Sequence, residues 1–180
     1  DDLIRETYLV AFSLTMPYLE PYLIRTFRGV ADAINDPELA ADVKHFIGQE
    51  AQHFQNHRRV NEMIKGQLGS TVAAELQAIE DRLDADYRRF TTSKSRRFNL
   101  VYAEGFEAMT CAMALTMFED AESGSGSTRF GQWQELWPWH AAEEIEHRTV
   151  AFNVYEHLEG SWAYRSTGSL RAQAHFQRAV

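Results

Sequence analysis

The stretch GQEAQHFQNH, residues 48–57, places a glutamate and two histidines within ten residues of otherwise helical character. An α-helix turns by about 100° per residue, so Glu50 and His53 share a face and His57 returns close to the direction of Glu50. Burying such a carboxylate is costly unless a partner binds it. The stretch therefore predicts a helix whose ionisable stripe meets a partner elsewhere in the chain.

A second copy of this spacing lies in WPWHAAEEIEHRTV, residues 137–150. Glu144 and His147 repeat the Glu-x-x-His pattern, and His140 lies one helical turn before Glu144 on the same stripe. Both copies fall near the middle of a predicted helix. Two helices of matching length thus carry the same pair of residue types at a similar depth.

Single glutamates stand in two further predicted helices. Glu20 lies among apolar and aromatic residues in MPYLEPYLIR, and Glu107 lies in VYAEGFEAMTCAMA. Four-helix bundles hold two iron or manganese ions with one Glu from each of two helices and a Glu-x-x-His pair from each of the other two. Carboxylates neutralise hard cations, and imidazole suits iron, manganese or zinc. The pattern therefore predicts a two-metal centre.

The composition excludes several functional classes. The 180-residue chain carries a net charge of -8, whereas binding to nucleic-acid phosphates needs clustered Lys and Arg. Its most apolar run, TYLVAFSLTMPYL, is shorter than the roughly 20 residues needed to span a bilayer. Cys111 is the only cysteine, so we expect a cytoplasmic protein without a disulfide. The length fits one domain over residues 1–180, with neither nucleic acid nor membrane as a partner.

Helical spacing recurs along the chain without a β-hairpin signal. We expect a first helix that begins or bends near Pro17 and ends near Ile34, and a second that begins with Asp36 as N-cap and Pro37 as its first residue. The second helix should end near residue 65. Further helices are predicted at 71–90, 94–121 and 132–158 and in the tail. The stretch ESGSGSTRFG, residues 122–131, is predicted to be a loop. The polar segment 71–90 is predicted to be a solvent-facing connector.

These elements predict an all-α four-helix bundle with an additional crossover helix and a C-terminal helix. An up-down-up-down bundle with short loops is the competing topology. In both arrangements the apolar stripes of the helices face one another, so the glutamates and histidines within those stripes would meet inside the bundle.

Four segments carry a family resemblance: SLTMPYLEPY, FIGQEAQHFQNH, EAMT and WHAAEEIEHRTVAFNVY. They resemble the bacterial family described as predicted metal-dependent hydrolases, a ferritin-like group, which implies a ferritin-like, metal-binding bundle. The spacing of His140, Glu144 and His147 is also similar to that of di-iron aryl-amine N-oxygenases, in which the additional histidine is a seventh ligand. That similarity implies His140 as a ligand, although those enzymes are longer than this chain.

Ten residues thus become candidates for the site. The predicted metal ligands are Glu20, Glu50, His53, Glu107, His140, Glu144 and His147. Glu104 lies one turn before Glu107 and competes with it, although the Glu-x-x-Thr match favours Glu107. Glu143 is expected to accept a proton from a ligand imidazole. For His57 three roles are considered: a metal ligand, a partner of a ligand, and a buried core residue.

The leading functional hypothesis is a di-iron oxidoreductase that activates dioxygen to oxidise a small organic substrate in an apolar pocket. The family resemblance suggests a rival, a metal-dependent hydrolase that uses a bridging metal-bound water. A ferroxidase or iron-handling protein is the third hypothesis. We expect two iron ions, with manganese, zinc or a mixed iron and manganese pair as alternatives. The expected partners are a small-molecule substrate, dioxygen and a second copy of the chain in a homodimer, and no catalytic residue beyond the ligands is predicted.

Overall fold

Helices make up every regular element of the part of the chain that the computed structural model describes, residues 2–122 and 133–179. They are α1 (Asp2–Arg28), a 3-10 turn η1 (Ala31–Ala33), α2 (Pro37–Gln67), α3 (Ser70–Ser93), α4 (Arg96–Glu122), α5 (Trp133–Glu146), α6 (Val150–Leu158) and α7 (Trp162–Ala179). The all-α prediction is confirmed. After Glu122, the predicted loop ESGSGSTRFG lies outside the described residues. Among the described helices, none is long and apolar enough to cross a bilayer.

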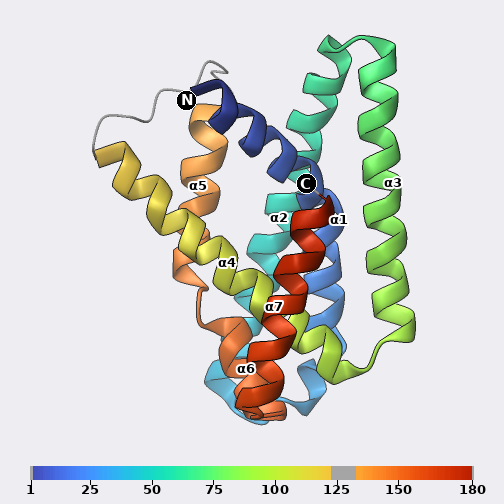
Figure 1. Ribbon diagram of the computed structural model, residues 1–180. Helices are drawn as coiled ribbons and strands as arrows, with labels where there is room; N and C mark the ends of the chain where they lie inside the picture. The colour runs from blue at the N-terminus through green and yellow to red at the C-terminus, as the bar shows by residue number, and fades with distance from the viewer. Residues whose placement is uncertain (1, 123–132, 180) are drawn as a thin grey trace.

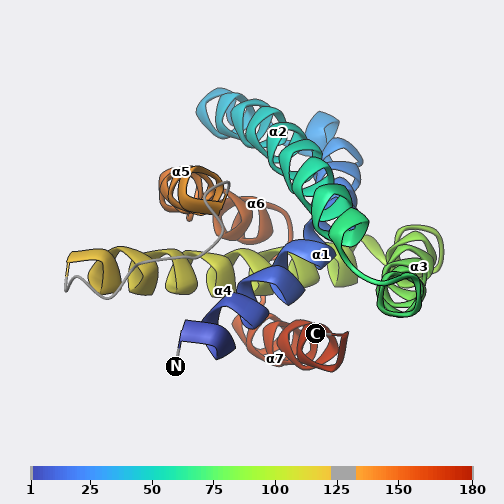
Figure 2. The ribbon, with the colours of Figure 1, turned by 90° about the horizontal axis from the view of Figure 1, so that it is seen from above.

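The long helix α3 determines the topology of the bundle. It runs back along the outside between the end of α2 and the start of α4, so α2 and α4 point in the same general direction (Figure 1). Seen from above, α3 and α7 lie outside the group formed by α1, α2, α4 and α5 (Figure 2). The crossover topology is therefore confirmed over the alternative with short loops. α3 also buries Leu83, Tyr87 and Phe90, so it is amphipathic and not simply a solvent-facing connector.

The start of α2 follows directly from the sequence. The side chain of Asp36 accepts hydrogen bonds from the backbone N–H groups of Glu38 at 2.9 Å and Leu39 at 3.3 Å. Pro37 occupies the first helical position, where a missing N–H has no helical acceptor to lose. From this cap the helix continues for 31 residues. It therefore carries the ionisable stripe of residues 48–57 into the bundle.

Of the two alternatives for the first helix, a start near Pro17 is wrong, because α1 begins at Asp2 and Pro17 lies in its interior, as the alternative of a bend requires. The helix ends at Arg28, before the predicted end near Ile34. A proline lacks an N–H and leaves the carbonyl four residues earlier without its helical donor. For Pro17 this is the carbonyl of Ser13, and the side-chain amide of Asn61 on α2 donates to it at 2.8 Å. A tertiary hydrogen bond thus replaces the helical one, and α1 continues through the bend seen in Figure 1.

The predicted fifth helix, 132–158, is in fact two helices. α5 ends at Glu146, and α6 begins at Val150 after a turn that contains His147. The N–H of His147 still bonds to the carbonyl of Glu143, and the N–H of Val150 bonds to the carbonyl of His147. His147 therefore continues the hydrogen-bonding pattern of α5 before the chain turns away.

Two glycines allow α7 to approach α4 closely. A Cβ at Gly105 on α4 would lie 2.5 Å from the Cα of Ser169, and a Cβ at Gly168 on α7 would lie 2.5 Å from the side chain of Val101. Neither distance is possible for real atoms, so any larger residue would push the helices apart. The contact fixes how α4 is turned within the bundle.

Candidate metal centre

The structure brings the predicted ligands together inside the bundle. Glu20 lies on α1, Glu50 and His53 on α2, Glu107 on α4, His140 and Glu144 on α5, and His147 one residue beyond α5. All seven are buried, and the most exposed of them, Glu144, is only 4% exposed. The side chains that share a predicted stripe in the sequence therefore do lie inside the bundle.

Their donor atoms form two groups that could each hold a metal ion. One contains Glu50, His53, Glu144 and His147, and the other contains Glu20, His57 and His140; within each group one donor atom per residue lies within 4.8 Å of the others. Glu107 adjoins the first group, since its Oε2 is 3.2 Å from Nδ1 of His147. The other ring nitrogen of His147, Nε2, is 3.3 Å from Oε1 of Glu50.

His140 and Glu144 join the two groups into one cluster. Nε2 of His140 lies 2.8 Å from Oε1 of Glu144 and 3.9 Å from Oε1 of Glu20. The second oxygen of Glu144 accepts a hydrogen bond from the hydroxyl of Thr110 at 2.6 Å. The rings of His53 and His140 stack with their centroids 4.1 Å apart. The cluster is therefore continuous across all four helices that contribute to it.

Many donor atoms of this cluster have no hydrogen-bond partner. They are both carboxylate oxygens of Glu20, Glu50 and Glu107, Nδ1 of His53 and both ring nitrogens of His147. Buried polar atoms are almost always paired, because each unpaired one costs about 1–3 kcal/mol. Carboxylate oxygens and imidazole nitrogens are the donors that bind iron, manganese and zinc. These residues therefore fit metal ions, which would satisfy the atoms that the protein itself leaves unpaired.

Burial and crowding shift the carboxylates toward their neutral forms. Burial, followed by repulsion from neighbouring carboxylates, raises the pKa values of Glu20 and Glu107 well above their usual value and that of Glu50 to about 8. Burial would also raise the pKa of Glu144, but its hydrogen bond with His140 and the nearby imidazoles outweigh burial and lower that pKa to about 2. Protons thus take the place of cations in the metal-free protein.

Glu143 holds one imidazole of the cluster in place. Its Oε2 lies 2.9 Å from Nε2 of His53, and its Oε1 accepts a hydrogen bond from the indole N–H of Trp139 at 3.0 Å. Because Nε2 of His53 is engaged in this way, Nδ1 is the nitrogen left to face the cluster. It lies 3.4 Å from Oε1 of Glu50.

A buried hydrogen-bond chain orients a second imidazole, that of His140. Since Nδ2 of Asn61 donates to the carbonyl of Ser13, Oδ1 of Asn61 faces the hydroxyl of Ser13, which donates to it at 2.6 Å. The hydroxyl oxygen then accepts from Nδ1–H of His57 at 2.8 Å. Burial lowers the pKa of His57 well below its usual value, so its ring is neutral and its Nε2 accepts from Nδ1–H of His140 at 2.6 Å.

This chain leaves Nε2 of His140 pointing toward Glu144, where their 2.8 Å contact requires a shared proton or a cation. The two ring nitrogens of His57 lie within hydrogen-bond distance of Ser13 and of the predicted ligand His140, so His57 contacts a ligand, and a direct role in metal binding stays a prediction. Glu104 points away from the cluster, because it accepts hydrogen bonds from Arg165 at 3.0 Å and Ser169 at 2.8 Å on α7. Glu107, and not Glu104, therefore lies next to the other predicted ligands.

Three residues that were not predicted for the site support the cluster: Ser13 contacts His57, Thr110 contacts Glu144, and Asn61 contacts Ser13. Asn61 lies one turn after His57 on the same stripe, and its spacing of four residues could have identified it. Thr110 likewise lies one turn after Glu107. Ser13 had no such signal, because it meets His57 across 44 residues of sequence.

The fold and the cluster together define a class, an all-α bundle with buried Glu and His groups placed to hold metal ions. The family described as predicted metal-dependent hydrolase matches residues 1–180, and the chain belongs to that family. No curated protein and no solved structure matches it. The resemblance to this family is therefore confirmed, whereas the similarity to ferritins and N-oxygenases stays a prediction.

Proposed function

We propose that the protein is an enzyme whose centre holds two metal ions, bound by Glu20, Glu50, His53, Glu107, His140, Glu144 and His147. The observation that carries this proposal is the set of buried carboxylate oxygens and imidazole nitrogens without hydrogen-bond partners. Four carboxylates would balance the charge of two divalent cations, and neutral imidazoles would complete the ligand set without adding charge. Iron is the metal we favour, with manganese and zinc as alternatives.

Hydrolysis is the first reaction class we propose, because the family is described as predicted metal-dependent hydrolase. Bound metal ions would polarise a substrate carbonyl and make water nucleophilic near neutral pH. The chain's own residues would position the donors: Glu143 holds His53, and Thr110 engages one oxygen of Glu144 so that the other faces the centre. The substrate would then be a small ester or amide.

Oxidation by dioxygen is the second candidate, and the surroundings of the cluster favour it. Four carboxylates and the imidazoles of His53 and His147 match the donor set of di-iron and di-manganese bundles, to which His140 adds a third imidazole. Aromatic rings pack against its imidazoles: Trp139 lies 5.0 Å from His53 and Phe46 lies 4.8 Å from His147, between ring centroids. Such apolar packing excludes water and suits an organic substrate with little polar surface.

One experiment tests both the centre and the reaction class. Metal-free protein is titrated with iron(II) without oxygen, then exposed to oxygen while absorbance and oxygen uptake are recorded. We expect two irons per chain in the wild type and fewer in Glu50→Gln. Oxygen uptake that depends on iron favours oxidation, whereas hydrolysis of ester or amide substrates by zinc- or manganese-loaded protein, without oxygen uptake, favours hydrolysis. A chain that binds none of these metals would contradict the proposed centre.

A further inference from the structure

Two neighbouring cavities lie between the first half of α1 and the second half of α4, and the inner one also reaches α5. The inner cavity, of about 20 Å³, is lined in part by His140 and Glu144 of the candidate metal centre. The outer cavity, of about 350 Å³, opens toward the surface and is lined in part by Tyr8. Met113 and Met117 line both cavities. They therefore lie where the two cavities adjoin.

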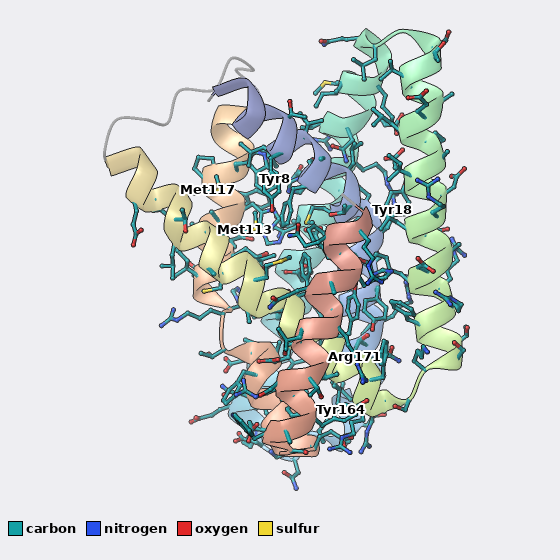
Figure 3. All side chains as sticks on the ribbon, viewed as in Figure 1. Tyr8, Tyr18, Met113, Met117, Tyr164 and Arg171 are labelled. Atoms are coloured by element: carbon teal, nitrogen blue, oxygen red, sulfur yellow. The ribbon has the colours of Figure 1, made fainter. Side chains whose placement is uncertain are left out.

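The side chains at this junction can move. Tyr8 lies beside Met113 and Met117 on the same face of the molecule (Figure 3), and its hydroxyl donates to Sδ of Met113 at 3.9 Å. Methionine has an unbranched side chain with three rotatable bonds, so it adapts its shape at low energetic cost. An inner cavity of this size holds about one water molecule. A larger molecule that entered from the outer cavity would have to displace the two methionine side chains to touch His140 and Glu144.

The outer cavity has the size and chemistry for an apolar ligand. Among the described residues that line it, none is charged, and the side-chain hydroxyls of Tyr8 and Thr116 are the polar groups. Its volume of about 350 Å³ exceeds the roughly 150 Å³ in which an apolar cavity can hold benzene. The inner end of this path touches His140 and Glu144. A ligand there would lie next to the side chains proposed to bind metal.

We propose that a small apolar molecule, about the size of one aromatic ring, binds in the outer cavity and reaches the metal centre past Met113 and Met117. The destination of this path rests on the proposed function, and the inference adds the substrate class for that same centre. An apolar ester or an apolar oxidisable ring would both meet this requirement.

Toluene is the probe, and the five methionines of the chain are the reporters. Metal-free protein with ¹³C-labelled methionine methyl groups is titrated with toluene and followed by NMR. We expect saturable shifts at Met109, Met113 and Met117, because the ring current of toluene acts on nearby methyl groups. Met63, which is 38% exposed on α2 and lines neither cavity, should not shift. Shifts that do not saturate, or that are equally large at Met63, would overturn the proposal.

Variants on α4 identify the binding site. Met113→Trp should fill the path and weaken toluene binding about tenfold or more, which is a change of about 1.4 kcal/mol. Leu115→Trp adds the same ring on the same helix, but Leu115 is 49% exposed and lines neither cavity, so binding should stay within twofold of the wild type. Thr116→Trp should fill the outer cavity from its exposed side and likewise weaken toluene binding. It serves as the test variant if Met113→Trp does not fold. Equal effects at Leu115 and at the cavity positions would contradict the assignment.

A paramagnetic metal tests whether the path ends at the centre. Bound toluene should relax faster in protein loaded with manganese(II) than in protein loaded with zinc, because relaxation falls steeply with distance from manganese. Manganese uptake without this effect would overturn the path alone. Toluene binding without any metal uptake would instead overturn the proposed function, so the two failures are distinguishable.

Discussion

The imidazole rings of His57 and His140 are joined by a hydrogen bond of 2.6 Å between Nε2 and Nδ1. His57 is held in turn by Ser13, and Ser13 by Asn61, whose amide occupies the place of the N–H that Pro17 lacks. A ring at the candidate metal centre is therefore oriented by a chain that begins at a bend in α1.

Replacing Asn61 by leucine removes the anchor of this chain while keeping a side chain of similar size. We expect metal binding to weaken by about 10–100-fold, the usual cost of removing a residue that orients a ligand. Competition with a coloured chelator measures the affinity, and circular dichroism checks that the variant is folded. The matched control is Asn56→Leu, on the same helix but not part of the hydrogen-bond chain. This variant should bind metal like the wild type. Unchanged affinity in Asn61→Leu would show that the chain does not orient His140.

Two glutamates one turn apart on α4 give a second matched pair. Glu107→Gln removes an acceptor from the cluster, so we expect fewer than two metal ions per chain by elemental analysis. Glu104→Gln should keep both ions but lower the free energy of unfolding by about 1–3 kcal/mol, because Arg165 loses its charged acceptor. Loss of metal in Glu104→Gln with full occupancy in Glu107→Gln would reverse the assignment.

The metal-free protein should lose stability as the pH rises from about 6.5 to 8. The pKa of Glu50 is raised from 4.5 to about 8 in the folded protein, so in this range the folded state binds more protons than the unfolded state. Stability then falls with pH. Below about pH 6.5 the unfolded state protonates His57 while the folded state keeps it neutral, because burial lowers its pKa. This effect makes stability rise with pH, so the predicted decline begins only at about pH 6.5.

Metal binding should remove this decline, because the ions displace the protons of the carboxylates. Thermal unfolding at pH 6.5, 7.2 and 8.0, with and without metal, measures both behaviours. The same displacement predicts proton release on metal binding, detectable by calorimetry in two buffers. A metal-free Tm that rises across the range would contradict the assigned direction.

Replacing glycine by alanine should have opposite effects on stability at two sites, one within the close contact between α4 and α7 and one away from it on α2. Gly105→Ala should lower the free energy of unfolding by about 1–3 kcal/mol, since its Cβ would collide with the backbone of Ser169. Gly48→Ala on α2 should raise it by roughly 0.5–1 kcal/mol, because a Cβ there meets nothing within 4 Å and alanine favours a helix. Chemical denaturation measures both. A destabilising Gly48→Ala would show that the effect is not one of contact.

Local signals in the sequence were sufficient for most of the helices and for the residues of the cluster. Asp36 and Pro37 define the start of α2 by chemistry that acts within one turn. The Glu-x-x-His spacing places Glu50 and His53 on one face whatever else the chain does. Such features are predictable because their physical cause lies within a few residues.

Features that depend on distant residues were not predictable in the same way. The helix α1 passes through Pro17 because Asn61 supplies a donor from another helix. Whether Glu107 or Glu104 faces the cluster depends on how α4 is turned against α7, which the small size of Gly105 permits. No local sequence pattern in α1 or α4 predicts these contacts with other helices. The break after Glu146, without a glycine or proline, was also missed.

The proline in the middle of α1 also bears on any attempt to make the protein more heat-resistant. Ordinary helix rules would recommend alanine at Pro17, since it restores an N–H to a long helix. That restored donor would compete with the amide of Asn61 for the carbonyl of Ser13. A substitution that straightened α1 would therefore leave the imidazole of His140 on α5 less firmly oriented. The helix would become more stable while the geometry of the candidate centre became less well defined.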